Sequence, residues 1–157
     1  MKTALKTAMA TSISEVLETM FFMSLDFGNN ASIETDVVGD SDKVVACKIT
    51  FKGEFSGHFV FLVPENTLLE MTENFMGLDS GDISKEETEG TAKEAINMLA
   101  GATLSSFDSG LVFNLSMPEI LDSKEATASA KESEDEIIVV TNTAGGYIAL
   151  KAIVESG

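Results

Sequence analysis

The chain has 157 residues, of which 44% are hydrophobic and 23% are charged, a composition typical of a folded globular domain. Acidic residues outnumber basic ones by 26 to 10, every basic residue is a lysine, and the formal net charge is −16. Because nucleic-acid binding depends on a basic surface that neutralises phosphates, this balance excludes a DNA- or RNA-binding protein. The same sign argues against docking on an anionic membrane.

The chain has few soft metal ligands and no long apolar run. Its one cysteine, Cys47, allows no intrachain disulfide, and with one histidine, His58, it lacks the ligands for a Cys/His zinc site. The N-terminal 23 residues are interrupted by polar residues, whereas a membrane span needs ~18 apolar residues in a row. We therefore expect a cytoplasmic protein that forms a single domain over residues 1–157.

The first third of the chain changes from helical to strand periodicity. Apolar residues over 5–23 recur on one side of a helical wheel, which predicts an amphipathic helix ending near Leu25. A weaker strand is expected over 32–38. Residues 43–63 alternate between apolar and polar on both sides of Gly53, which indicates two strands joined as a hairpin.

Two capping boxes predict the helices that follow. The spacing of Thr67 and Glu70 is that of a capping box for a short helix that ends at Met76, with a left-handed glycine after it. The pair Ser84 and Glu87 predicts the start of a long helix over 85–107.

The last third of the chain reads as strands. They are expected over 112–116, 136–141 and 147–154, and the last two are joined by a turn at 144–146. The acidic run 122–136 is either a solvent loop or an exposed edge strand. Adjacent strands on both sides of the helices indicate an α+β protein with a largely antiparallel sheet.

Cys47 and His58 offer one candidate for chemistry, a thiolate beside an imidazole. Cys47 has the same parity as Val45 and Ile49, which favours a buried structural thiol. His58 has the opposite parity to Phe59, which places it on the surface or at an interface. The periodicity therefore favours structural roles for both residues.

The long helix carries an unusual outward face. Glu94, Asn97, Gly101 and Gly90 all lie within about 40° of the direction that points away from the predicted core. A helix interior with glycine in place of alanine is destabilised by ~1 kcal/mol for each glycine, so two glycines here suggest close approach by a partner. The apolar residues that border this face are Met98 and Leu104. The alternative is an ordinary solvated face, since an acid and an amide three residues apart are common on helices.

The sequence EAINMLAG at 94–101, with LSMPEI at 115–120, resembles the CheC/CheX/FliY phosphatases of bacterial chemotaxis. Their signature is E-x-x-N on a long exposed helix, with a small residue four positions after the asparagine. The opening helix, beginning SEVLETMF at 14–21, looks most similar to that of CheX. The resemblance implies a CheC-like fold, in which two long pseudo-repeated helices lie on one face of the sheet.

The resemblance also implies a mechanism. Asn97 would enter the active site of a phosphorylated response regulator of the CheY type and orient the water that attacks its aspartyl phosphate. Glu94 would pair with the regulator's lysine, and Gly101 would let the partner backbone come close. The chain would need no cofactor of its own, because Mg²⁺ is expected in the regulator. Relatives of the CheX type form homodimers, so a homodimer is expected here.

The resemblance predicts one site rather than two. Superposing the first helix on the long helix puts Glu18 at the position of Asn97 and Phe22 at that of Gly101, so the first helix lacks both the amide and the clearance. Gly90 departs from the family pattern, which often has an acidic residue there. Two other readings remain: a non-catalytic module that docks a regulator or another signalling protein, and an unrelated acidic α+β scaffold.

Overall fold

The structure is a computed structural model that describes residues 2–27, 33, 37, 43–133, 135–143 and 145–155. Its helices are α1 (Lys2–Met20), α2 (Glu65–Met76), the 3-10 turn η2 (Ser80–Asp82), α3 (Lys85–Phe107) and α4 (Ser123–Ser129). Its strands are β1 (Leu25–Asp26), β2 (Val44–Lys52), β3 (Ser56–Pro64), β4 (Asn114–Leu115), β5 (Glu119–Ile120), β6 (Ile137–Thr143) and β7 (Gly146–Glu155).

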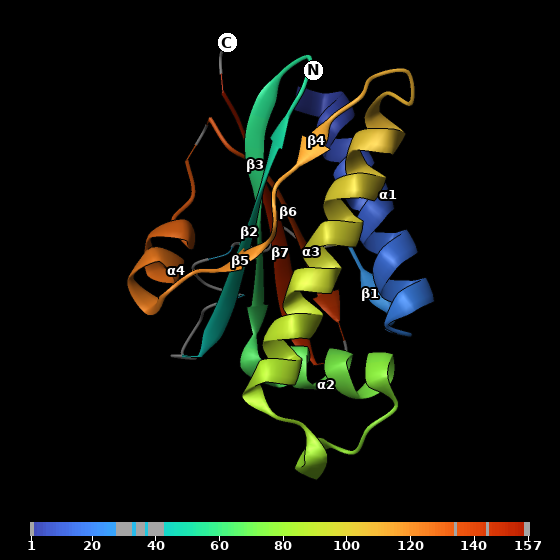
Figure 1. Ribbon diagram of the computed structural model, residues 1–157, viewed down its shortest axis with the longest axis vertical. Helices are drawn as coiled ribbons and strands as arrows, with labels where there is room; N and C mark the ends of the chain where they lie inside the picture. Colours follow the sequence, from blue (N-terminus) through green and yellow to red (C-terminus); the bar gives the residue numbers. More distant parts are fainter. Residues whose placement is uncertain are drawn as a thin grey trace.

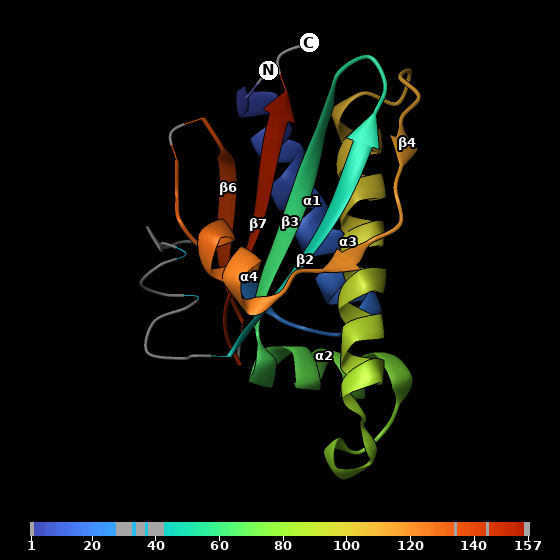
Figure 2. The same cartoon turned by 60° about the vertical axis from the view of Figure 1, so that its left-hand side comes forward.

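The strands form one seven-stranded sheet in the order β1-β6-β7-β3-β2-β4, with β5 also paired to β2, and every pairing is antiparallel. Two long helices, α1 and α3, lie on one face of the sheet (Figure 1). Helix α4 lies on the opposite face, and α2 closes one end (Figure 2). The expected α+β architecture is therefore confirmed.

Alternation along β2 and β3 divides the side chains between two cores. The larger core lies between the sheet and the helices α1 and α3, and it includes Cys47, Phe59 and Phe61. The smaller core lies on the α4 side and includes Val60 and Leu62. Burying both faces explains why the centre of β3 is apolar without interruption over 59–63.

The two long helices pack against each other and share a buried hydrogen bond. The hydroxyls of Ser12 on α1 and Thr103 on α3 lie 2.6 Å apart, and neither side chain is accessible to solvent. Ser12 donates its single hydroxyl hydrogen to the carbonyl of Met9, at 2.9 Å, so Thr103 is the donor between the helices. Together with the buried apolar side of α3, this bond holds α3 in one orientation about its axis, and so directs its outward face.

The smaller core contains a buried charge. Lys151 on β7 is 2% exposed, and its ammonium lies 2.9 Å from the carboxylate of Glu136. It also donates to the carbonyl of Ser129, the last residue of α4, at 2.7 Å, and to that of Lys131 just beyond the helix, at 2.9 Å. All three donors of the ammonium are thus engaged, and the group has a structural role.

Several predicted boundaries were wrong. The acidic run 122–136 contains a helix, α4, which begins with a capping box formed by Asp122 and Glu125 rather than with a loop or an edge strand. The box predicted at Thr67 does not exist, because α2 begins earlier, after Pro64, and the Thr67 hydroxyl bonds instead to the carbonyl of Gly145, at 3.2 Å.

The ends of other helices and strands also differ from the predicted ones. Helix α1 begins at Lys2 and ends at Met20, before the expected end near Leu25. Only Asn114–Leu115 of the expected strand 112–116 pairs, and β1 was not expected at all. Most of the weak strand predicted over 32–38 lies outside the described residues.

Candidate functional site

Helix α3 presents Glu94 and Asn97 side by side on its outward face. Both side chains are exposed, and neither makes a hydrogen bond or ion pair with any residue that the structure describes. The opposite side of the helix is fully buried at Ala92, Ile96 and Leu99. The helix therefore presents a carboxylate and an amide that are one turn apart and have no partner among the described residues. Its buried side holds the helix backbone against the core.

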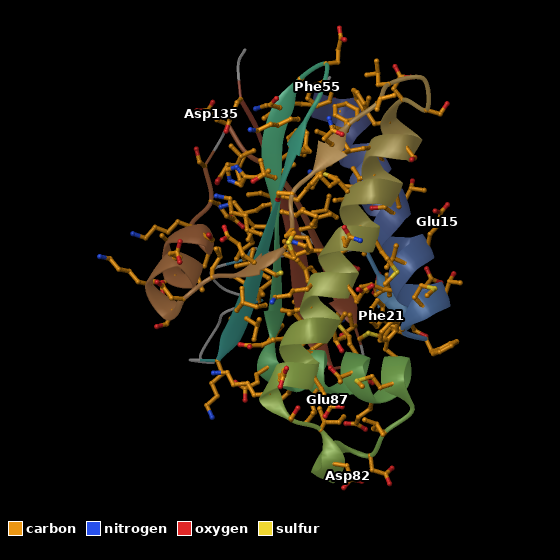
Figure 3. The ribbon with its side chains drawn as sticks, in the orientation of Figure 1. Glu15, Phe21, Phe55, Asp82, Glu87 and Asp135 are labelled. Atoms are coloured by element: carbon orange, nitrogen blue, oxygen red, sulfur yellow. The ribbon has the colours of Figure 1, made fainter. Side chains whose placement is uncertain are left out.

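The start of α3 is fixed by a capping box. Ser84 accepts a hydrogen bond from the backbone N–H of Glu87, at 3.1 Å, and the Glu87 carboxylate accepts one from the backbone N–H of Ser84, at 2.9 Å. Figure 3 shows Glu87 at this end of the helix, close to α2. The box was predicted from the sequence, and it secures the first turn of the helix that carries the candidate site.

The two helix glycines open onto solvent. A Cβ built at Gly90 or Gly101 meets no heavy atom within 4 Å apart from the helix's own backbone. Neither glycine is therefore needed for packing within the chain, although each weakens the helix by ~1 kcal/mol relative to alanine. Both occupy the same outward face as Glu94 and Asn97, where their small size leaves room for a partner.

A hollow of about 280 Å³ lies beside Gly101. Its walls come from the last turns of α3 and from residues 111–115, among which Val112 is 82% exposed. Leu104 is only 4% exposed, so it reaches the surface as a wall of this hollow and not as a projecting contact. Met98 is half-buried and packs against the larger core.

Aromatic contacts hold the outer wall of this hollow in place. The ring of Phe113 lies 5.9 Å from that of Phe51 and 5.1 Å from that of Phe55, between centroids. Gly53 allows this approach, because a Cβ there would lie 2.7 Å from both the Phe113 ring and the Val112 carbonyl. Residues 111–113 were not predicted as part of the site. The available signal was the pair of turn residues Asp108 and Gly110, which follow the end of α3 and reverse the chain.

Cys47 and His58 do not form a pair. Cys47 faces the larger core, whereas His58 has the opposite parity and is half-buried, and the register pairs Cys47 with Phe61 and His58 with Thr50. Burial raises the pKa of the Cys47 thiol to about 12, so it is a structural thiol as expected. Burial, and then the charge of Lys48, lowers the pKa of His58.

Neither metal ligation nor membrane spanning has support among the described residues. No group of three or more His, Cys, Asp or Glu side chains within them is placed to hold a metal ion. None of the helices in this part of the chain combines the length and the apolar character that crossing a bilayer requires.

The counterpart on α1 differs in conformation as well as in residue type. Glu15 and Glu18 are exposed there, as Glu94 and Asn97 are on α3. Phe22 is 72% exposed, but it lies beyond the end of the helix at Met20 and has a positive φ of 54°. The superposition that placed Phe22 one helical turn beyond Glu18 therefore does not hold in space.

A sheet with two long helices on one face, one of them displaying E-x-x-N and a glycine, defines a protein with the CheC-like fold. The sequence over residues 45–142 matches the family described as chemotaxis phosphatase CheX. The chain belongs to the CheX family. No curated protein matches the sequence.

Solved structures share the fold over nearly the whole chain. CheX from Vibrio vulnificus has 19% sequence identity, and the match covers 99% of each chain with a TM-score of 0.73. A CheC-like superfamily protein from Shewanella sp. PV-4 has 18% identity, with 99% of this chain and 100% of that chain covered and a TM-score of 0.71. CheX of Borrelia burgdorferi, solved as a complex with CheY, BeF3 and Mg²⁺, has 20% identity, 96% and 97% coverage and a TM-score of 0.68.

Proposed function

We propose that this chain accelerates hydrolysis of the aspartyl phosphate of a CheY-type response regulator. In this reaction Asn97 orients the attacking water, and Glu94 pairs with the lysine of the regulator's active site. Membership of the CheX family supports phosphatase activity, and the Borrelia CheX solved together with CheY supports a response regulator as the partner. The assignment of Asn97 and Glu94 rests on the E-x-x-N resemblance and on their position.

The outward face of α3 carries the proposal. Glu94 and Asn97 are exposed and unengaged there, while Gly101 leaves open space one turn further along the helix. A side chain that must enter another protein's active site has to project from a rigid element without intramolecular partners. This face meets both requirements.

The chemistry requires positioning more than charge from this chain. An asparagine amide has both donors and an acceptor, so Asn97 can hold a water in line with the phosphorus atom while its N–H group faces a phosphoryl oxygen. A carboxylate in the same place would repel the phosphoryl group. Mg²⁺ bound in the regulator would neutralise phosphoryl charge, so a chain without arginine could serve this hydrolysis.

The test is the decay of phosphoaspartate on a CheY-type regulator mixed with the native chain or with a variant. Native protein should accelerate decay, and Asn97→Ala should lower the acceleration by about a hundredfold, in the range seen when one positioning or polar stabilising group is removed. Glu94→Gln should weaken regulator binding. Glu18→Ala is the matched control on α1 and should leave both quantities unchanged.

Two outcomes would contradict the proposal. If phosphoaspartate on the regulator decays at the same rate with and without the native chain, the proposed phosphatase function is wrong. If the native chain binds the phosphorylated regulator but does not accelerate decay, the chain is a non-catalytic docking module.

We also infer a cytoplasmic homodimer from the family resemblance. The sheet edges are occupied by β1 on one side and by β4 and β5 on the other, and each of these strands has only two residues. Within the part of the chain that the structure describes, these short strands cover only part of β6 and β2, and the uncovered edge is the surface that we propose for pairing with a second chain. Sedimentation equilibrium should give twice the monomer mass, and a monomer over the micromolar range would exclude the dimer.

A further inference from the structure

An exposed apolar patch lies where the C-terminal ends of α1 and α2 meet. Four large apolar side chains form this α1–α2 patch, with exposed fractions of 40%, 72%, 37% and 44% for Met20, Phe22, Phe75 and Met76. The two helix ends are joined beneath it, because the fully buried ring of Phe21 lies 5.1 Å from the ring of Phe75, between centroids.

A hydrogen bond fixes the relative position of the two helix ends. The side-chain amide of Asn74 on α2 donates to the carbonyl of Phe21, at 2.9 Å. Figure 3 shows Phe21 at the lower end of α1, beside α2. The patch is therefore built on two anchored helix ends and is already formed in the free protein.

Phe22 adopts a conformation that suits glycine. Its φ of 54° lets the chain turn back, so that the N–H of Met23 reaches the carbonyl of Leu17, at 3.1 Å. Helix α2 ends with a left-handed residue too, but there the residue is Gly77, with a φ of 69°. A phenylalanine with a left-handed backbone conformation is strained. Because Phe22 is 72% exposed, burial within the chain does not offset this strain. An exposed strained aromatic indicates a contact outside the chain.

Acidic side chains border the patch on both helices. Glu15 and Glu18 are exposed on the last turns of α1, and Glu73 lies one turn before Met76 on α2. In Figure 3 the side chain of Glu15 points outward from α1 on the side of the molecule away from the sheet. The described stretches that hold the two helix ends, 7–26 and 65–84, contain no lysine or arginine. An apolar surface with an acidic surround is complementary to a basic amphipathic segment.

We propose that the α1–α2 patch docks a protein segment in which apolar residues are flanked by lysines or arginines. A second copy of this chain would bring the same acidic surround against the patch, and an anionic membrane would be repelled for the same reason. The surface is separate from the outward face of α3, and the proposal does not depend on the phosphatase function.

The experiment measures binding of a fluorescent synthetic helix of leucine and lysine, about 18 residues long, with apolar residues at helical spacing. Native protein should bind it, and the double substitution Phe22→Ser with Met76→Ser should weaken binding by about tenfold or more. Val112→Ser is the matched control, because Val112 is an exposed apolar residue on another surface. Equal weakening by the control, or none by the double variant, would show only non-specific attraction to an acidic protein and overturn the proposal.

A second variant separates docking from folding. Phe22→Gly relieves the left-handed strain, so it should raise the midpoint of thermal unfolding while it weakens peptide binding. Glu18→Lys should weaken binding of the peptide and reduce the dependence of this binding on salt.

Two results would assign the patch to a different occupant and overturn the proposal. One is binding to phosphatidylglycerol vesicles that depends on Phe22, and the other is loss of a dimer in Phe22→Ser. Phosphatase activity should be unchanged in Phe22→Ser. A loss of activity would mean that the patch is part of the surface that binds the regulator, and would overturn the proposal of a separate docking site.

Discussion

Helices α1 and α3 have the same relation to the sheet but different outward faces. Both cover one face of the sheet and contact each other (Figure 1). The side of α1 that packs inward contains large residues such as Leu5, Met9 and Leu17, whereas α3 buries alanines at 92, 95 and 100 together with Ile96 and Leu99. Different inward faces thus satisfy the same packing requirement.

The outward faces have diverged in a way that packing does not explain. On α3 the face combines Glu94, Asn97 and Gly101, with open space over the glycine. On α1 the corresponding region carries carboxylates and ends in the strained Phe22. The difference teaches that the fold constrains one side of each helix, while the other side can be used for separate partners.

The largest effect is expected when phenylalanine, the residue type at position 22 beyond the end of α1, replaces Gly101 in α3. Gly101→Phe should raise the dissociation constant for the regulator by about a hundredfold, or about 2.8 kcal/mol, because the ring would occupy the space that the partner needs. The free energy of unfolding should change by less than about 0.5 kcal/mol, since a Cβ at this position meets open space. Titration with a labelled regulator measures the first quantity, and urea denaturation measures the second.

Ser106→Phe is the matched control for Gly101→Phe. Ser106 is an exposed residue of the same helix, half a turn of rotation away from Asn97. It should leave regulator affinity unchanged. An equal loss of affinity in both variants would mean that any bulky addition to α3 disturbs binding, and the special role of Gly101 would be lost.

The next effect concerns the hydrogen bond that joins the two helices. Ser12→Ala should lower the free energy of unfolding by about 2 kcal/mol, because it leaves the buried Thr103 hydroxyl without its acceptor. Thr103→Val should cost less, since Ser12 keeps its bond to the Met9 carbonyl. The double variant should be more stable than the sum of the single changes by at least about 0.5 kcal/mol. Additive losses in urea denaturation would contradict coupling between the helices.

A smaller effect is expected at the other open glycine of α3. Gly90→Ala should raise the free energy of unfolding by about 1 kcal/mol, because alanine is the better helix former and its Cβ meets no neighbour. Gly77→Ala is the matched control and should destabilise, since Gly77 has a φ of 69°. Thermal and urea unfolding of both variants check the opposite signs. Destabilisation by Gly90→Ala would mean that this part of α3 is constrained by contacts that open space does not predict.

Local sequence signals predicted the parts of the fold that local physics determines. The capping box of Ser84 and Glu87, the left-handed Gly77 and the buried parity of Cys47 were all confirmed. Each depends on residues within one turn or one strand. The outward position of Glu94 and Asn97 was predicted for the same reason, because helical periodicity assigns the exposed side once the buried side is known.

Tertiary contacts determine the features that were not predicted from the sequence. Thr67 has the spacing of a capping residue, but its hydroxyl binds the carbonyl of Gly145, 78 residues away, and α2 begins earlier. The acidic run forms α4 because Ala126 and Ala130 are buried against the smaller core, and because Lys151 binds the carbonyls of Ser129, the last residue of the helix, and of Lys131 just beyond it. The hollow beside Gly101 depends on Phe113 packing against β2, which no local pattern reveals.

The smallest effect tests whether residue type alone distinguishes the two helices. Glu18→Asn together with Phe22→Gly recreates on α1 the order of Glu, Asn and Gly that α3 carries, starting from Glu15. In an Asn97→Ala background this variant should not restore acceleration of phosphoaspartate decay. Helix α1 ends at Met20, so position 22 does not lie one helical turn beyond position 18, and α1 lacks the clearance that Gly101 provides within α3.

The control for that comparison is the same α1 double substitution in a chain that keeps Asn97, where acceleration should remain at the native level. This control shows that the altered α1 leaves the fold and the α3 site intact. Restored activity in the Asn97→Ala background would instead mean that the motif is sufficient wherever it is exposed. A continued absence of activity would mean that Glu, Asn and Gly in this order are not sufficient, which is the result expected from the end of α1 at Met20.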